Sequence, residues 1–212
     1  MLQIKSFVFN PVEENTYIIY NEFNDCVIID PGCYYDEEKD KLFQYINEMG
    51  LKPQKLLNTH CHLDHVFGNR FIAEKFSLEL HIHPKDKPVL DYAAASGLMY
   101  NLPFDNYSGK LVFLEEGQSI VLGEDTLNIL FTPGHSPGSI SFYSPAYGFI
   151  ISGDVLFHRS IGRTDIPLGD HDTLIKSIKE KLLVLPDETI VHSGHGPITT
   201  IGEEKKYNPF LT

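Results

Sequence analysis

Three histidines and one aspartate fall within a single seven-residue run of this 212-residue sequence, Thr59-His60-Cys61-His62-Leu63-Asp64-His65. The run follows the apolar pair Leu56-Leu57, which we interpret as the end of a strand. Side chains alternate along an extended segment, so His60 and His62 are expected on one face. Asp64 and His65 are expected on the turn that opens the next helix, where they can face a second ion. The run therefore predicts ligands for two metal ions.

Three further strand ends carry side chains of the same kind. Thr132-Pro133-Gly134-His135 and Ser193-Gly194-His195 each add a histidine, and Ser152-Gly153-Asp154 adds a carboxylate after an apolar run. Neutral imidazole is a nitrogen donor, and a carboxylate can bridge two ions. We predict one ion at His60, His62 and His135, a second ion at Asp64, His65 and His195, and Asp154 as the bridge. This donor set predicts two divalent metal ions, with zinc as the first choice and iron or manganese as alternatives.

The other histidines and the cysteines are interpreted as structural. Cys61 alternates to the face opposite His60 and His62, so we expect a small buried core residue rather than a nucleophile. Its spacing from Cys26 and Cys33 does not suggest disulfides. His192 is interpreted as a residue that could donate a hydrogen bond to one of the metal ligands. No metal ligand is expected among the remaining histidines, which are His81, His83, His158 and His171.

The composition is that of a soluble globular protein, with 42% hydrophobic and 22% charged residues. The net charge of −12 argues against a nucleic-acid partner, which requires a basic surface. No apolar run reaches the length of a membrane span, about 20 residues, and the first residues do not resemble a signal peptide. We therefore expect a cytoplasmic protein that acts on a small molecule. The oligomeric state stays open.

In the first half, strands are predicted at residues 2–9, 16–20, 27–30, 55–59 and 79–83. Helices are predicted at 36–49, 65–76 and 84–106. The first of these has apolar residues at Leu42, Phe43, Ile46 and Met49, with acidic residues in its first turn and Gly50 at its end. The histidine run thus lies between a strand and a helix.

The second half repeats this plan, with strands at 119–122, 126–131, 139–143, 149–152 and 189–192. A helix is predicted at 172–183, where Leu174, Ile175, Ile178 and Leu182 share one face and Pro186 prevents continuation. No linker rich in glycine, proline or serine separates the halves. We therefore predict one domain, residues 1–212, with two sheets, helices outside them, and a site along their shared edge.

The run of residues 59–65, taken with His135, Asp154 and His195, resembles the metallo-β-lactamase superfamily. The resemblance extends from Asn15-Thr16 through Ile29-Asp30-Pro31-Gly32 to the segment around His195. It implies an α/β fold, the αβ/βα sandwich of two mixed sheets flanked by helices, with a dinuclear metal site at one edge. It also implies that the five histidines, Asp64 and Asp154 are the metal ligands.

Within this superfamily the chain is most similar to the single-domain type II glyoxalases, which are hydroxyacylglutathione hydrolases. The segment Ser160-Ile161-Gly162-Arg163-Thr164-Asp165 and the tail Asn208-Pro209-Phe210-Leu211 carry that similarity. The implied activity is a thioesterase that cleaves S-D-lactoylglutathione or a related acyl thioester. The implied mechanism is attack by a metal-bridging hydroxide that Asp64 holds.

Classical enzymes of this group use a helical region after the last histidine to supply basic residues for glutathione. Here 17 residues follow His195, and their only basic side chains are Lys205 and Lys206. We therefore predict Arg159 and Arg163 as the substrate-binding residues, although Arg163 could instead brace its loop through Asp165. The aromatic residues Tyr100, Phe104 and Tyr107 could line a substrate groove or pack in the core.

Two alternatives to the thioesterase stay open. Persulfide dioxygenases resemble this chain as well, and that resemblance implies a single iron held by His60, His135 and Asp154. The second alternative is a hydrolase of another small ester, thioester or lactone. One iron per chain favours the dioxygenase, whereas two metals per chain favour hydrolysis.

Overall fold

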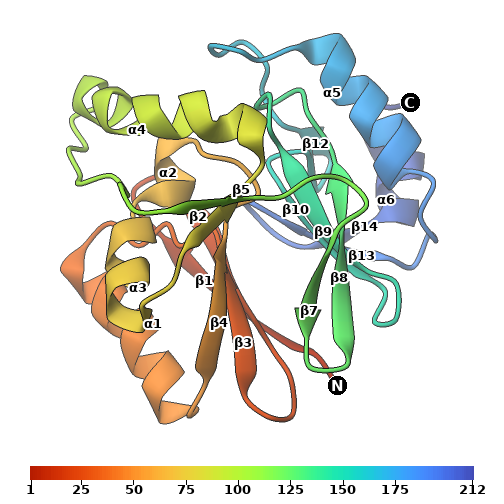
Figure 1. The fold of residues 1–212 in the computed structure, drawn as a ribbon. Coiled ribbons are helices and arrows are strands. Elements are labelled where there is room, and N and C mark those ends of the chain that lie inside the picture. The colour runs from red at the N-terminus through yellow and green to blue at the C-terminus, as the bar shows by residue number, and fades with distance from the viewer.

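The computed structural model describes residues 1–212 and consists of four layers in the order helices, sheet, sheet, helices (Figure 1). The first sheet has the strand order β1 (Gln3–Phe9), β2 (Glu14–Tyr20), β3 (Asp25–Ile29), β4 (Lys52–Leu57), β5 (Leu80–Ile82) and β6 (Leu111–Phe113). The strands from β1 to β3 pair antiparallel, and those from β3 to β6 pair parallel, so this sheet is mixed.

The second sheet is also mixed. Its strand order is β14 (Thr199–Thr200), β13 (Ile190–Ser193), β10 (Phe149–Gly153), β9 (Ile140–Ser144), β8 (Asp125–Phe131) and β7 (Ser119–Leu122). Strands β10 and β13 pair parallel, and the other neighbours pair antiparallel. A separate hairpin consists of β11 (Leu156–Phe157) and β12 (Ser160–Ile161).

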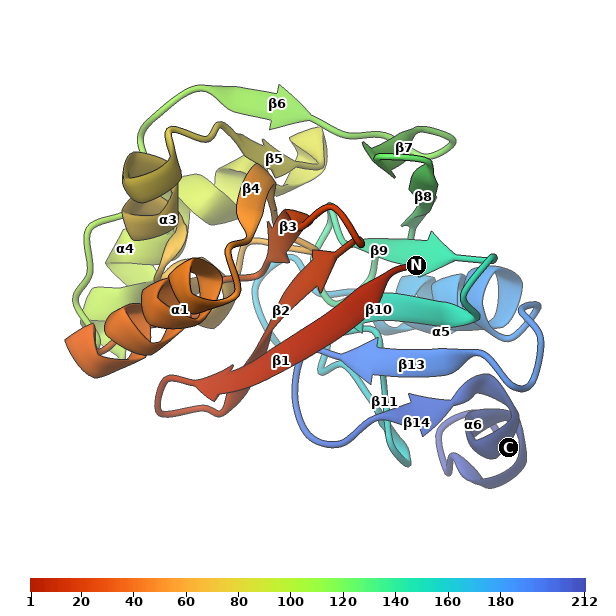
Figure 2. The same cartoon turned by 90° about the horizontal axis from the view of Figure 1, so that it is seen from below.

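Helices cover the outer face of each sheet (Figure 1). On the first sheet lie α1 (Asp36–Glu48), α2 (Leu63–Val66), α3 (Asn69–Phe76), the 3₁₀ turn η1 (Pro84–Asp86) and α4 (Lys87–Met99). On the second sheet lie α5 (His171–Ser177), its π-helical continuation η2 (Ile178–Leu182) and α6 (Ile201–Tyr207), which follows the edge strand β14 (Figure 2). None of the helices is long and apolar enough to cross a membrane.

The alternation of strand side chains builds three apolar layers. In β2, Ile18 joins the cluster under α1, α3 and α4, whereas Tyr17 and Ile19 join the cluster between the sheets. In β10, Ile150 faces α5 and α6 while Ile151 faces the first sheet. Buried apolar area stabilises a fold by roughly 25 cal/mol per Å², so these strands contribute on both faces. The predicted sandwich of two mixed sheets flanked by helices is confirmed.

The predicted helix over residues 65–76 is wrong in one respect, because the structure divides it into α2 and α3 at Gly68. The amide of Gly68 donates to the carbonyl of Pro31 at 2.7 Å. A Cβ on residue 68 would overlap Cys33 Sγ and lie 2.6 Å from that carbonyl oxygen. Close packing of two backbone segments thus fixes the break.

The prediction over residues 84–106 is also too long. The helical part ends at Met99, and Asn101 has a φ of 57°, which turns the chain away from the helix axis. Sequence patterns missed β6, β11, β12, β14 and α6, each of seven residues or fewer. Elements this short carry too few positions for a periodic signal.

Candidate metal centre

The first two predicted histidines lie beyond the carboxyl end of β4. His60 and His62 point to the same side of the extended chain, with ring centroids 4.9 Å apart. Cys61 turns to the opposite side and is fully buried in the cluster under the helices. The prediction that Cys61 is a core residue is confirmed, because the alternation of an extended segment separates it from both imidazoles.

Asp64 and His65 lie on α2, which begins at Leu63. The side-chain amide of Asn10 donates to the backbone carbonyls of Asp64 and Gly32, both at 3.0 Å, and so fixes the start of this helix. One short turn therefore presents two donor groups that an extended chain would direct to opposite sides.

His135 lies in the turn between β8 and β9. Gly134, with a φ of 135°, precedes it, and a Cβ at residue 134 would overlap the backbone of Leu174 on α5. The imidazole Nδ1 of His135 lies 2.8 Å from the carbonyl oxygen of Arg163. That bond places the proton on Nδ1 and leaves Nε2 as the free donor atom.

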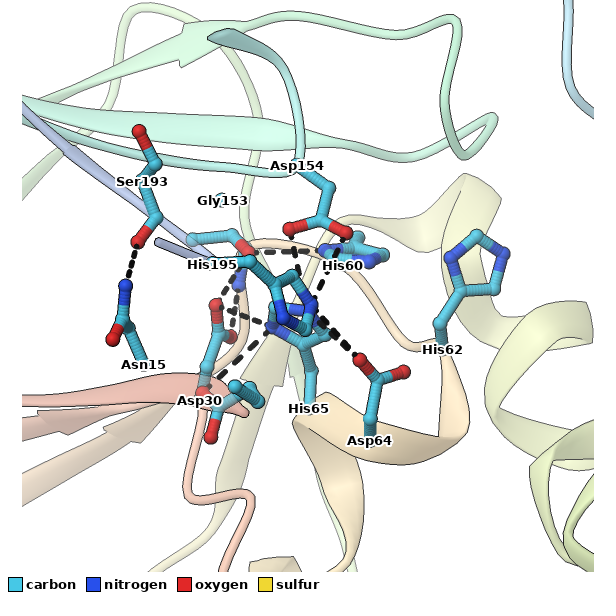
Figure 3. A network of polar contacts seen from close by, with 12 residues as sticks. Asn15, Asp30, His60, His62, Asp64, His65, Gly153, Asp154, Ser193 and His195 are labelled. Atoms are coloured by element: carbon cyan, nitrogen blue, oxygen red, sulfur yellow. Dashed lines mark hydrogen bonds and ion pairs between the residues drawn. The ribbon is translucent and has the colours of Figure 1, made fainter. Parts of the chain in front are cut away.

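Asp154 and His195 follow the parallel neighbours β10 and β13, so both are brought to the same edge. The amide of Gly194 donates to the carbonyl of Gly153 at 2.9 Å, which joins the two segments. Across the sandwich, Asn15 donates to the carbonyls of Ser193 and Gly196 (Figure 3). The first sheet thus holds the segment that carries His195.

The structure brings the predicted first ligand group together. The donor atoms of His60, His62 and His135 lie within 4.8 Å of one another. Nδ1 of His62 is 2.8 Å from Nε2 of His135. Nε2 of His60 is buried and has no hydrogen-bond partner. Three imidazole nitrogens therefore converge on one point.

The second predicted group also converges, with the donor atoms of Asp64, His65 and His195 within the same 4.8 Å limit. Oδ2 of Asp64 is 3.1 Å from Nε2 of His195 and 3.5 Å from Nε2 of His65. The ring nitrogen Nδ1 of His195 faces the carbonyl oxygen of Val12 at 3.0 Å, which again leaves Nε2 directed at the site (Figure 3).

Asp154 lies between the two groups. Its Oδ1 is 3.4 Å from Nε2 of His65 in the second group. Its Oδ2 is 3.5 Å from Nε2 of His135 in the first group and 3.6 Å from Nε2 of His195 in the second. Figure 3 shows this carboxylate above His60 and His195. A carboxylate so placed can bridge two ions.

These residues fit divalent ions on the chemistry of their atoms. Two ligands that each lie about 2.1 Å from a tetrahedral ion are separated by roughly 3.4 Å, a spacing close to the observed ones. The buried atoms Nε2 of His60, Nε2 of His65 and Oδ1 of Asp154 have no hydrogen-bond partner in the protein. Buried polar atoms are rarely left unsatisfied, so a bound cation accounts for them.

Asp30, at the end of β3, is a site residue that the sequence analysis did not single out. Its Oδ2 is 3.1 Å from Nδ1 of His65 and accepts a hydrogen bond from Thr59 Oγ1 at 2.5 Å. Thr59 Oγ1 in turn lies 3.1 Å from Nδ1 of His60. Asp30 therefore orients an imidazole in each group. The sequence pattern that identified Asp154 also applies to Asp30, because both residues directly follow an apolar strand.

The two groups differ in their protonation. Burial, and then the imidazole of His65, holds the pKa of His60 well below its usual value, and burial with His135 lowers the pKa of His62 to about 3. Burial also disfavours the charged form of His65, but Asp154 and Asp64 outweigh it and raise the pKa of His65 well above normal. His60 and His62 thus present neutral nitrogens at neutral pH, whereas the charge of His65 is compensated by the carboxylates of Asp154 and Asp64.

Exposure differs across the site. His60, His65 and His135 are buried, while the side chains of Asp64 and His195 are 15% and 26% exposed. The site therefore has a buried side toward the core and a partly exposed side, which we call the open side, at Asp64 and His195.

The two predicted arginines lie in different surroundings. Arg163 holds His135 through its carbonyl, and its exposed guanidinium makes two bonds to Asp165, at 2.8 and 3.1 Å. Arg159 donates to Glu203 at 2.6 Å, and its guanidinium lies 4.6 Å from the ring centroid of Tyr207. Arg163 is thus at the site, whereas Arg159 faces α6. Their roles in substrate binding stay predictions.

Of the two alternatives for the aromatic residues, the structure favours core packing for Phe104 and Tyr107. Tyr100 is exposed, while Phe104 and Tyr107 pack against the cluster under the helices. Phe104 also lines a cavity of about 540 Å³ between α1 and α3, together with Tyr34 and Phe67. None of the seven candidate ligands lines that cavity.

The expectation for His192 is wrong. Its ring packs edge-on against Tyr17 and Phe149, with centroids 5.6 and 6.0 Å apart, and donates to no ligand. Alternation along β13 explains this, because His192 faces the interior of the sandwich and not the site at its edge.

Comparisons with known proteins agree with this geometry. Residues 10–195 match the family model of the metallo-β-lactamase superfamily. The probable metallo-hydrolase YqgX of Bacillus subtilis is 41% identical over 95% of this chain and 93% of its own length. Hydroxyacylglutathione hydrolase GloC of Haemophilus influenzae is 40% identical over 94% and 93%.

Two solved structures are similar over nearly the whole chain. BLEG-1, described as a B3 metallo-β-lactamase, superposes with a TM-score of 0.91 at 40% identity and covers 99% of this chain and 100% of its own. TTHA1623 in a di-iron-bound form gives a TM-score of 0.88 at 38% identity, covering 98% and 100%. With its fold, its His and Asp cluster and these relatives, the chain belongs to the metallo-β-lactamase superfamily and is a metallo-hydrolase of that superfamily.

Proposed function

We propose that this chain is a thioesterase of glyoxalase II type, which hydrolyses S-D-lactoylglutathione or a related small acyl thioester. Two divalent ions, zinc by first choice, would be held by His60, His62 and His135 and by Asp64, His65 and His195, with Asp154 as the bridge. The relative GloC, 40% identical along almost the full chain, supports this substrate class.

The position of Asp154 is the observation that carries the proposal. Its two oxygens lie 3.4–3.6 Å from nitrogens of both ligand groups, so a single carboxylate can serve both. Ions bound there would polarise the thioester carbonyl and lower the pKa of a water molecule to about 7. We therefore expect Asp154 to be shared by two ions, because it faces nitrogens of both groups.

The protein's own groups prepare the reaction. His65 and His195 outweigh burial and lower the pKa of Asp64, so its carboxylate is ionised and can accept a hydrogen bond from the attacking water. The buried wall of His60, His65 and His135 excludes bulk water from one side. A thiolate leaving group with a pKa near 8.5 needs little protonation. A thioester substrate therefore does not require a separate acid for its leaving group.

We assign to Arg163 the binding of a carboxylate on the thiol part of the thioester substrate. Its guanidinium is exposed, and its backbone carbonyl lies beside the first ligand group through the contact with His135. Arginine binds carboxylates bidentately, as the pair with Asp165 already illustrates. A substrate carboxylate would replace Asp165 on the same fork.

The test is steady-state hydrolysis of S-D-lactoylglutathione by the metal-loaded protein, with metal content measured on the same sample. We expect two ions per chain and a kcat/KM above roughly 10⁴ M⁻¹s⁻¹, the range of enzymes on their own substrates. Asp154→Ala is expected to lose both metal and turnover. Hydrolysis that persists in metal-free Asp154→Ala would contradict the proposal.

A mononuclear iron persulfide dioxygenase is the second candidate, because His60, His135 and Asp154 alone could hold one ion. The similar structure TTHA1623 supports iron as a metal for such a site, although it is described in a di-iron-bound form. Oxygen uptake with glutathione persulfide, at one iron per chain and without thioester hydrolysis, would favour it. A small ester, a lactone and a β-lactam complete the substrate panel, the last because BLEG-1 is described as a B3 metallo-β-lactamase.

A further inference from the structure

A second buried carboxylate, that of Asp86, lies behind the first ligand group. It is 0% exposed and stands at the N-cap of α4. An aspartate in this position ordinarily accepts a hydrogen bond from its own helix. Here it makes no such bond. The side chain is directed at other parts of the chain instead.

Three donors reach this carboxylate. Oδ2 of Asp86 accepts from the backbone amide of Cys61 at 2.6 Å. Oδ1 accepts from the hydroxyl of Ser136 at 2.6 Å and from the amide of Gly138 at 2.7 Å. All three bonds are buried, so no water competes for them. Charge-assisted bonds of this kind are short and strong.

The donors belong to the two segments that carry the first ligand group. Cys61 stands between His60 and His62, and Ser136 directly follows His135. Asp86 therefore ties the segment with two of the histidines to the segment with the third. The amide of Ile140 also donates to the carbonyl of Thr59 at 2.8 Å, so Asp86 adds a second connection between these segments, on the side of Cys61 and Ser136.

The contact between residue 138 and Asp86 requires a glycine at position 138. A Cβ on residue 138 would lie 2.5 Å from the amide nitrogen of Asp86 and 2.7 Å from its Oδ1. The backbone of Gly138 thus approaches the carboxylate of Asp86 directly, with no side chain between them. The turn that carries His135 cannot shift relative to Asp86 without breaking two hydrogen bonds.

Asp30 and Asp86 divide the support of the site. Asp30 contacts His65 directly and reaches His60 through Thr59. The hydrogen bonds of Asp86 involve no residue of the second group, Asp64, His65 and His195. A defect at Asp86 is therefore expected to be confined to the first group.

We propose that Asp86 is a positioning residue that holds His60, His62 and His135 in ligand geometry for one of the two ions. This rests on the ligand groups assigned under the proposed function. The mechanism is mechanical, since Asp86 fixes the backbone on both sides of the three imidazoles and contacts neither ion nor substrate.

The test is Asp86→Asn, which keeps the shape but places an amide N–H where a carboxylate oxygen accepted. Zinc affinity is measured by competition with a chromophoric chelator, and cobalt(II) loading reports the coordination geometry of each ion by its visible spectrum. His62→Ala and His195→Ala identify the signals of the first and second ion. We expect Asp86→Asn to lower the zinc affinity of the first group about 10- to 100-fold, as the loss of a residue that supports a metal ligand does. The zinc affinity of the second group should not change.

Asp91→Asn is the matched control, because Asp91 lies on the same helix and forms an exposed pair with Lys87. It is expected to bind both ions as the wild type does. Ser136→Ala removes one of the three donors and is expected to give a smaller loss in the same direction. It keeps the proposal testable if Asp86→Asn does not fold.

In a His135→Ala background, Asp86→Asn is expected to add no further loss, because the two changes act on one group. Unchanged zinc affinity in Asp86→Asn, or equal weakening of both ions, would overturn the proposal. The readout is metal binding, so a wild-type protein that binds two zinc ions but cleaves no thioester leaves this inference standing and removes the proposed function alone.

Discussion

Nδ1 of His62 lies 2.8 Å from Nε2 of His135, although 73 positions separate the two residues in the sequence. Nδ1 of His135 already faces the carbonyl of Arg163, so its Nε2 carries a lone pair. Burial lowers the pKa of His62 to about 3, which keeps that ring neutral. Two ring nitrogens at this separation are either joined by a hydrogen bond or directed at one cation.

This contact predicts the effect of His62→Ala. If His62 is a ligand, the variant binds one zinc ion per chain where the wild type binds two, and thioester hydrolysis falls at least about 100-fold. Metal analysis of the dialysed protein checks this. His171→Ala, at the exposed start of α5, is the control. Full retention of bound metal in His62→Ala would favour the mononuclear candidate, whose ligands are His60, His135 and Asp154.

Gly194 is expected to tolerate no side chain. A Cβ on residue 194 would overlap Oδ1 of Asp154 and lie 2.8 Å from Cε1 of His65. Gly194→Ala should therefore displace the bridging carboxylate and reduce both metal content and turnover. Gly148→Ala is the comparison, because Gly148 has a φ of 62° and open space around its Cβ position. It should cost about 1 kcal/mol of stability and leave metal content unchanged; equal metal content in both variants would contradict this account.

Arg163→Ala is expected to raise KM for S-D-lactoylglutathione about tenfold with little change in kcat, because a lost charge-assisted hydrogen bond to the substrate is worth about 1.5–3 kcal/mol. Arg159→Ala should leave KM unchanged, since its guanidinium is bonded to Glu203 and lies against Tyr207. Steady-state kinetics on the two variants separate the predicted arginines. A larger rise in KM from Arg159→Ala than from Arg163→Ala would indicate that Arg159 binds the substrate carboxylate.

His192 predicts a pH dependence of stability. Burial lowers its pKa to about 4 from a usual value of 6.5. Between these values the unfolded chain binds the proton more readily, so stability present above pH 6.5 is lost as the pH falls toward 4. Thermal melting of metal-free protein should therefore show a shallower decline between pH 6.5 and 5 for His192→Phe than for wild type. If the melting temperatures of the two proteins fall in parallel with pH, the protonation of His192 does not contribute to the pH dependence of stability.

The sequence determined much of the site because strand ends are local features. A histidine or aspartate directly after an apolar strand must lie at the edge of a sheet, whatever the topology. Alternation separated Cys61 from His60 and His62, and the structure agrees. The same reasoning predicted two sheets with outer helices, since apolar strands such as β2 and β10 must be covered on both faces.

Only the tertiary structure decided which strand ends meet and what supports them. The supporting carboxylates, Asp30 and Asp86, act across distances in sequence of 25 to 52 residues, on Thr59, Cys61 and Gly138 among others. The break at Gly68 and the inward packing of His192 likewise depend on contacts between distant segments. Periodicity and spacing describe one segment at a time. The contacts that fix donor atoms to within tenths of an ångström belong to pairs of segments, and folding alone brings those pairs together.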